Sequence, residues 1–281
     1  MTTGTAVGEP AGDDVTDAGE RVCADRADFG FFAHLSIYRF ARPHVAGRRV
    51  LDAGCGTGYG AHDLALAGAA AVLGVDASDR AIAFCRDRYC HPRLAFETGD
   101  LMALAVPGPF DVVFCSNVLE HLPDPDPFLE AVRRLLTRDG LLVMAVPPVR
   151  GLGEWFGNLE NPYHLTNLPP EVWRAKLDRF FTAVQGYSHG VEPAFIGADQ
   201  QIRRAAVTSA AQFRFAAETL ERLSGPLPTI SLINVATGPR SVTLPRTHVE
   251  DTLPIAWVEA RIRRDFGRLM AFKRRHGAAA A

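Results

Sequence analysis

The pattern of apolar and polar positions predicts five strands that alternate with helices between residues 48 and 147. The runs RRVLDAG, AAVLGVDAS, LAFETGD, FDVVFCSN and GLLVMAVP are short and mostly apolar, as expected of strands with both faces buried. Helical segments separate them. SDRAIAFCRDRYC has Ser78 at its predicted N-cap, and DPDPFLEAVRRLLTRDG begins with prolines and ends at a glycine. This alternation predicts a parallel, doubly wound sheet whose strand C-termini share one edge, where such sheets bind ligands.

The flanking segments extend the same fold. FGFFAHLSIYRFA, residues 29–41, predicts an amphipathic helix before the first strand. After a loop rich in Gly, Pro and Trp at 147–162, PPEVWRAKLDRFF predicts a sixth helix, and TAVQGYSHG and TISLINVATG predict two more strands. We therefore predict a Rossmann-like α/β fold with a mostly parallel, seven-stranded sheet, an N-terminal helix, a helical lid insertion and a C-terminal helical extension.

Composition and periodicity divide the chain into consecutive parts. Residues 1–24 have few large apolar groups and predict a mobile tail, and residues 25–190 form the α/β core. Residues 191–228 predict a helical lid over the ligand edge, and residues 229–240 the final core strand. An apolar stripe in the C-terminal extension, residues 241–281, fits either core packing or a homodimer contact.

Charge and composition narrow the classes of partner. The 281 residues carry a net charge of −2, so the chain has no overall attraction for nucleic acid or anionic membranes. No apolar run approaches the roughly 20 residues of a membrane span, and the polar N-terminus lacks a signal peptide, so we expect a cytoplasmic protein. Cys85, Cys90 and His91 match no usual zinc spacing, and no metal is expected there.

The strongest chemical signal is VLDAGCGTGYG, residues 50–60. Gly54, Gly56 and Gly58 let the backbone turn sharply after a strand and approach a ligand with no Cβ in the way. No lysine stands beside them, as a phosphate-binding loop would require, and GTGYGA matches a dinucleotide-binding pattern only weakly. Asp52 would repel a pyrophosphate and attract the ammonium of an amino-acid ligand, although it also fits a role in supporting the loop amides.

Two further carboxylates follow at the next strand tips. Asp76 ends the second strand, where a carboxylate accepts hydrogen bonds from vicinal ribose hydroxyls in both dinucleotide and adenosyl ligands. Asp100 follows the third strand, where it would accept from an adenine amino group with Leu101 as apolar cover. Each aspartate also fits a plainer role, as a loop carboxylate or a helix cap.

Candidate bases lie at the same edge. Asn117, Glu120 and His121 follow the fourth strand, and His164 lies in the loop that begins with a proline. Histidine suits general base chemistry near neutral pH. The alternatives are a packed helix-start residue for His121 and a loop anchor for His164. His34, on the N-terminal helix, is a weaker candidate.

Together, VLDAGCGTGYG, GVDAS, TGDLM and FDVVFCSNVLEHLPDP resemble the consecutive motifs of class I S-adenosylmethionine (SAM)-dependent methyltransferases. The resemblance covers about residues 29–190 in the right order and spacing. It implies that the loop glycines line the methionine and ribose parts of SAM, that Asp76 holds the ribose hydroxyls and that Asp100 binds the adenine.

The same resemblance implies further contacts. Ser116 and Asn117 would flank the methionine part near the sulfonium, and Arg39 in YRFA would meet the SAM carboxylate. VLEHLPDP is also similar to the ubiquinone-type O-methyltransferases, in which E-x-x-E-H holds a divalent metal. This chain has N-x-x-E-H, with Asn117 in place of one carboxylate, so we expect no metal.

These observations predict methyl transfer from SAM to an oxygen or nitrogen of a small-molecule acceptor, with His164, or failing it His121, as the base. NPYHLTNLPPEVWRAKLDRFF resembles a segment of small-molecule and sugar methyltransferases, which favours a sugar, an aminocyclitol or another natural-product scaffold. A quinone or lipid acceptor is the first alternative. The alternatives of another class are an NAD(P)-dependent oxidoreductase and a non-catalytic SAM-fold partner protein; Asp100 argues against the first and the complete glycine loop against the second.

Overall fold

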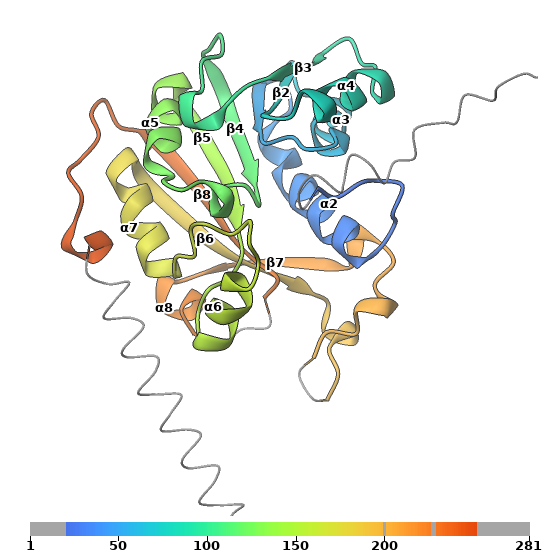
Figure 1. The fold of residues 1–281 in the computed structure, drawn as a ribbon, viewed down its shortest axis with the longest axis vertical. Helices are drawn as coiled ribbons and strands as arrows, with labels where there is room; N and C mark the ends of the chain where they lie inside the picture. The colour runs from blue at the N-terminus through green and yellow to red at the C-terminus, as the bar shows by residue number, and fades with distance from the viewer. Residues whose placement is uncertain (1–20, 199–200, 226–228, 252–281) are drawn as a thin grey trace, which may run out of the picture.

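A central sheet lies between two layers of helices in the computed structural model, which describes residues 21–198, 201–225 and 229–251 (Figure 1). The strands are β1 (Arg49–Ala53), β2 (Ala71–Asp76), β3 (Leu94–Thr98), β4 (Phe110–Ser116), β5 (Leu136–Val146), β6 (Phe181–Val191), β7 (Phe213–Glu218) and β8 (Ser231–Pro239). The α-helices are α2 (Phe29–Ala41), α3 (Tyr59–Leu66), α4 (Asp79–Arg88), α5 (Asp126–Leu135), α6 (Leu152–Leu159), α7 (Pro170–Phe180) and α8 (Leu220–Leu223).

The sheet has the order β3-β2-β1-β4-β5-β8-β6-β7. Strands β1 to β5 pair in parallel, whereas β8 runs antiparallel to β5 and β6, and β7 runs antiparallel to β6. The parallel part confirms the prediction and brings the C-termini of β1, β2, β3 and β4 to one edge. The strand order reverses at the connection from β3 to β4, which returns the chain to the other side of β1 and opens the crevice used by ligands in such sheets.

Both faces of the parallel strands are buried, which explains their continuous apolar sequence. Leu51 and Val113 point to the layer that contains α5 and α7. The preceding residues on the same strands, Val50 and Val112, point to the layer of α2, α3 and α4. Successive strand side chains point to opposite faces, so the site edge rests on two cores packed back to back.

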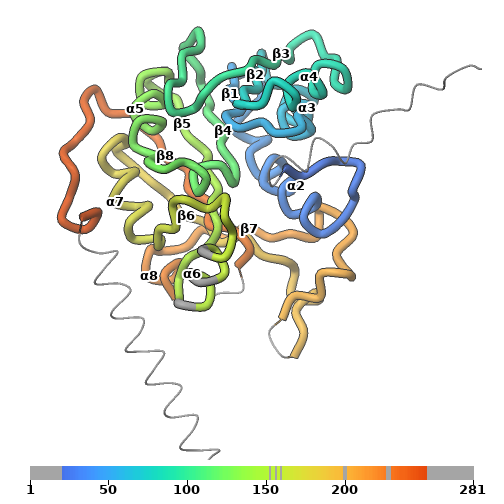
Figure 2. The backbone as a smooth tube through the Cα atoms, in the orientation of Figure 1, coloured from blue at the N-terminus to red at the C-terminus, as the bar shows by residue number. Residues whose placement is uncertain are grey.

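The predicted helical lid over residues 191–228 is wrong. This segment holds short 3₁₀ turns, the strand β7 and the one-turn helix α8, so the sheet has eight strands in the described residues rather than seven. Phe213 and Phe215 alternate with exposed Arg214, and this period of two is typical of a half-buried strand. Figure 2 shows the segment folded back beside α2, where Phe29 packs on Phe213 with ring centroids 5.6 Å apart.

Two element boundaries also differ from the prediction. The loop expected at 147–162 contains α6, whose first turn is stabilised because the Glu154 carboxylate accepts the Arg150 backbone N–H at 2.6 Å. Helix α5 ends at Leu135 instead of at Gly140, and β5 begins directly at Leu136, which pairs with Phe110. The other helices and strands predicted within the described residues are confirmed within a few residues.

The two chain ends lie mostly outside the described residues. Residues 1–20 and 252–281 are not described, so the mobility of the tail, the apolar C-terminal stripe and the homodimer contact stay predictions. Residues 21–24, expected in the tail, lie against the glycine loop, since Thr57 donates to the Val22 carbonyl at 2.7 Å. Among the helices that the structure describes, none has the length and apolar character needed to cross a bilayer.

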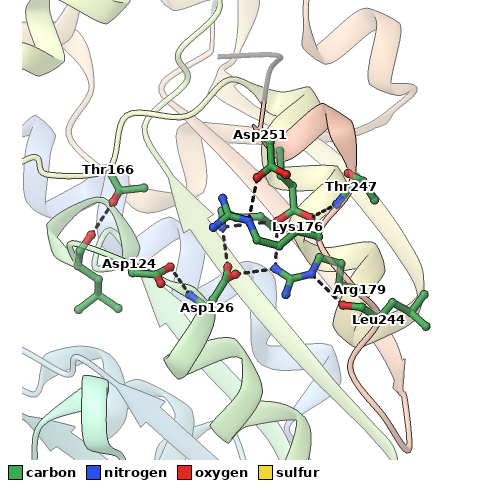
Figure 3. Close-up of polar contacts among 11 residues, drawn as sticks. Asp124, Asp126, Thr166, Lys176, Arg179, Leu244, Thr247 and Asp251 are labelled. Carbon is green, nitrogen blue, oxygen red and sulfur yellow. Dashed lines mark hydrogen bonds and ion pairs between the residues drawn. The ribbon is translucent and has the colours of Figure 1, made fainter. Parts of the chain in front are cut away.

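A buried ion network anchors the start of the C-terminal extension to α7 (Figure 3). Lys176 and Arg179 of α7 both pair with Asp126 at the start of α5, and Arg179 also pairs with Glu250 at 3.0 Å. Burial alone raises the pKa of Asp126, but hydrogen bonds from the two cations outweigh it, and the pKa is lowered. Two cations and two carboxylates therefore balance inside the protein, as buried charges require.

Candidate active site

The loop between β1 and α3 has a backbone that only glycine adopts easily. Gly54, Gly56 and Gly58 have φ values of +80°, +54° and +80°. A Cβ on Gly54 would lie 2.4 Å from Val118 Cγ2, and one on Gly58 would lie 2.7 Å from Cys85 Sγ. A Cβ on Gly56 would meet no atom within 4 Å, because this residue faces open space. The loop therefore packs tightly against Val118 and Cys85 at Gly54 and Gly58, and it faces open space at Gly56.

That open space is a cavity of about 420 Å³ at the C-terminal edge of the sheet. Its wall includes seven residues predicted from the sequence to bind the cofactor, namely Gly54, Gly56, Asp76, Asp100, Leu101, Ser116 and Asn117. His121, one of the two predicted bases, also lines it. The topology thus brings together residues from four strand ends, as the sequence predicts.

Asp76 is fixed at the mouth of the glycine loop. Its Oδ2 accepts the Gly56 backbone N–H at 3.0 Å, and its Oδ1 accepts the Ser78 N–H at 3.0 Å. Oδ1 also accepts from Arg21 Nη2 at 3.0 Å. The sequence gives no signal for Arg21, which lines the cavity from within the segment expected to be a mobile tail.

Asp100 combines a place on the cavity wall with a capping role. Its carboxylate accepts the Met102 N–H at 2.8 Å and caps the 3₁₀ turn Leu101–Ala103. Leu101 is buried and supplies an apolar surface beside it. The capping role is therefore present, and the adenine contact of Asp100 stays a prediction.

Asp52 does not line the cavity but lies beneath it, fully buried. The Tyr38 hydroxyl lies 3.2 Å and 3.3 Å from its two carboxylate oxygens and donates to them. Burial raises the pKa of Asp52 to about 8; the Tyr38 hydrogen bond opposes this and the charge of Asp76 adds to it. A largely neutral side chain at pH 7 would attract an ammonium group only weakly, and its hydrogen bonds connect β1 to α2 through Tyr38.

Arg39 is exposed and away from the cavity wall. His34 and Tyr38, one helical turn apart on α2, line the cavity instead. Consecutive helix residues differ by about 100° around the axis, so Arg39 points away when Tyr38 points inward. Gly58 also lies off the wall, where it caps the start of α3.

His121 and His164 meet at the wall of the cavity although they are far apart in sequence. Their ring centroids lie 5.1 Å apart, with His121 at the cavity surface and His164 behind it. His121 Nδ1 lies 2.9 Å from the Tyr163 carbonyl oxygen. A carbonyl only accepts, so Nδ1 carries the hydrogen and Nε2 carries the lone pair.

Asn117 has an uncommon backbone for a residue with a side chain. Its φ is +52°, in the left-handed region, and its Nδ2 donates to Ser116 Oγ at 3.2 Å. Such backbones concentrate at ligand-binding sites because the surrounding structure must hold them in place. The backbone at the end of β4 thus has an uncommon conformation at the point where it lines the cavity.

Comparison with known proteins agrees with this geometry. Residues 51–144 match the model of a methyltransferase domain family. Over 182 residues the chain is 34% identical to a protein of Mycobacterium tuberculosis named as a probable S-adenosylmethionine-dependent methyltransferase, covering 63% of this chain and 65% of that protein. It is 36% identical over 108 residues to the ubiquinone biosynthesis O-methyltransferase of Pseudomonas aeruginosa, covering 37% and 46%.

The fold has solved counterparts. A SAM-dependent methyltransferase of Thermotoga maritima superposes with a TM-score of 0.55 at 16% identity, covering 75% of this chain and 91% of that one. The curated matches span less than two thirds of the relatives' own length. Residues 51–144 therefore match a methyltransferase domain, and the chain is similar in sequence and in fold to SAM-dependent methyltransferases.

Proposed function

We propose that the protein transfers a methyl group from SAM to an oxygen or nitrogen of a small-molecule acceptor. The observation that carries this proposal is the cavity in which the Gly56 backbone faces open space beside the fixed carboxylate of Asp76. When bound, SAM supplies an electrophilic methyl group on a good leaving group. Asp76 would hold the ribose hydroxyls, with Leu101 as apolar cover for the adenine.

The exposed part of the cavity lining is suited to the acceptor. Tyr163 and Leu165 belong to it and are 50% and 59% exposed, which gives the opening an apolar rim. His34 and His121 add polar groups to the same wall. A ring-shaped scaffold with both apolar faces and hydroxyl groups, such as a sugar, an aminocyclitol or another natural product, fits this mixture.

A quinone or lipid acceptor is the second candidate. The apolar rim formed by Tyr163 and Leu165, together with the similarity to a ubiquinone biosynthesis O-methyltransferase, favours it. Kinetic comparison of a polar glycoside and a hydrophobic phenol as acceptors distinguishes the two classes.

His121 would receive the acceptor proton, and His164 would support it from behind. The Tyr163 hydrogen bond places the hydrogen of His121 on Nδ1 and therefore its lone pair on Nε2, the nitrogen that would take the proton. The loop of His164 is fixed to this segment because the Leu165 and Thr166 N–H groups both donate to the Glu120 carbonyl, at 2.7 Å and 2.9 Å. Such positioning lowers the barrier of a transfer that mainly requires alignment.

Calorimetry with SAM, S-adenosylhomocysteine and NAD tests the cofactor, and release of S-adenosylhomocysteine with a panel of acceptors tests the reaction. We expect binding of the two adenosyl ligands and none of NAD. His121→Ala should lower turnover about 10²-fold or more, while His62→Ala, at a histidine outside the cavity wall, should leave it unchanged. Absence of SAM binding would overturn the proposal.

A further inference from the structure

Glu120, His121 and His164 form a cluster with the donor set of a transition-metal site. One ligand atom from each lies within 4.8 Å of the others, in the only such group of three found among the described residues. Two ligand atoms that share one ion at about 2.1 Å lie at most about 4.2 Å apart. Small rotations of the three side chains therefore suffice to close the site.

The histidine tautomers suit metal binding. Asn158 Nδ2 donates to the Glu154 carbonyl at 2.7 Å, which orients the amide so that its Oδ1 accepts from His164 Nδ1 at 2.7 Å. His121 Nδ1 is likewise held by the Tyr163 carbonyl. Both rings therefore carry their hydrogen on Nδ1 and present the Nε2 lone pair. Metal-binding histidines almost always have such a second partner.

The backbone holds the two ligand-bearing segments together. Leu165 and Thr166 donate to the Glu120 carbonyl, and Thr166 Oγ1 donates to the Leu122 carbonyl at 2.5 Å. Glu120 is only 2% exposed, so its carboxylate lies in a place where a cation is favoured. The two ligand-bearing segments are thus held together by the protein itself.

We propose that Glu120, His121 and His164 bind one divalent transition-metal ion such as Zn²⁺ at the wall of the cavity. Two imidazole nitrogens and one carboxylate favour such an ion over Mg²⁺ or Ca²⁺, which prefer oxygen ligands. The expectation of no metal was based on the missing carboxylate at Asn117. His164, which is distant in the sequence, supplies a third ligand in its place. Three protein ligands leave an open coordination position toward the cavity, as in catalytic zinc sites.

The catalytic meaning of this site rests on the proposed function, whereas the binding itself does not. Without an ion, His121 would act as the base of the proposed function; with an ion bound, it would be a ligand instead. The charge of the ion would then lower the pKa of an acceptor hydroxyl in the cavity, and the proton would leave to solvent.

The test is calorimetric titration of the EDTA-treated full chain with Zn²⁺, against a competing chelator. We expect one ion per chain, and at least tenfold weaker binding in His164→Ala and Glu120→Gln. Asn158→Leu, which touches only the second partner of His164, should weaken binding about tenfold. His91→Ala, a histidine outside the cluster, is the matched control and should bind as the parent does.

Three results would overturn the site: no stoichiometric Zn²⁺ binding, parental affinity in His164→Ala, or Mg²⁺ binding as tight as that of Zn²⁺. If a variant fails to fold, as judged by circular dichroism, the visible spectrum of the Co²⁺-loaded parent reports nitrogen ligation instead. A spectrum identical to that of aqueous Co²⁺ would refute the proposed site. SAM is titrated separately in EDTA. SAM binding without Zn²⁺ binding ends this proposal alone, and Zn²⁺ binding without SAM binding ends the proposed function alone.

Discussion

His189 of β6 is a fully buried histidine that should make the stability of the protein sensitive to mild acid. Its Nε2 lies 2.9 Å from Ser36 Oγ, and that hydroxyl donates its own hydrogen to the Ala33 carbonyl at 2.7 Å. His189 must therefore donate from Nε2. Its Nδ1 is buried with no hydrogen-bond partner in the part of the chain that the structure describes. A second proton on Nδ1 would have no acceptor.

The size of the effect follows from the pKa shift. Burial, aided by the charge of nearby His34, lowers the pKa of His189 from 6.5 to about 3. In the unfolded chain the imidazole titrates near 6.5, so the unfolded state gains the proton first as the pH falls. The stability is fully present above pH 6.5 and declines below it, and linkage gives a loss of about 2 kcal/mol at pH 5.

Urea unfolding of the parent and of His189→Phe, at pH 7.5 and pH 5.0, measures this loss. Phenylalanine keeps the ring that stacks on Phe215 with a centroid distance of 4.7 Å, but it cannot titrate. The parent should lose about 2 kcal/mol more than the variant between the two pH values. His91→Ala should keep the pH dependence of the parent. Equal losses in the parent and in His189→Phe would refute the reasoning, whatever the stability of the variant at neutral pH.

Three further predictions test the loop, the ribose carboxylate and the ion network. Asp76→Ala should weaken SAM binding at least tenfold by calorimetry, because two hydrogen bonds to a charged acceptor are lost, while Asp79→Ala at the start of α4 should change it less than twofold. Gly54→Ala should lower the free energy of unfolding by about 1–2 kcal/mol more than Gly68→Ala; both have positive φ, but only the first places its Cβ against a valine, and equal costs in urea unfolding would contradict this. Glu250→Gln should lower the free energy of unfolding by about 3–5 kcal/mol, because two buried cations of α7 then share one carboxylate; an unchanged thermal midpoint would show that the network contributes nothing.

The parallel half of the fold was predictable because its strands bury both faces and end at chemically distinctive residues. The glycines after β1 and the aspartate that ends β2 mark positions where local sequence alone dictates the backbone. Strand β7 was not predictable, because FRFAAE is short and its burial depends on Phe29 and His189, which pack against it from distant segments. Tertiary contacts of this kind leave only a weak local pattern.

The candidate site divides in the same way. Residues whose role depends on their place at a strand tip, such as Asp76 and Ser116, were located correctly on the cavity wall. Residues were not located correctly where their position depends on the rotation of a helix about its axis or on a contact with a segment distant in the sequence. Arg39 is one position away from the inward face of α2, and His164 reaches His121 only because its loop is fixed to the Glu120 carbonyl.

The count of hydrogen bonds at Asp76 adds a constraint that the sequence cannot supply. A carboxylate offers about four lone-pair positions, and the N–H groups of Gly56 and Ser78 and the Arg21 guanidinium already use three of those on Asp76. Two ribose hydroxyls need two. The backbone bonds are part of the loop that shapes the cavity, whereas Arg21 reaches Asp76 through its side chain alone. If Asp76 holds the ribose as proposed, SAM must take over the position of the Arg21 contact, and the ion pair is exchanged for the cofactor.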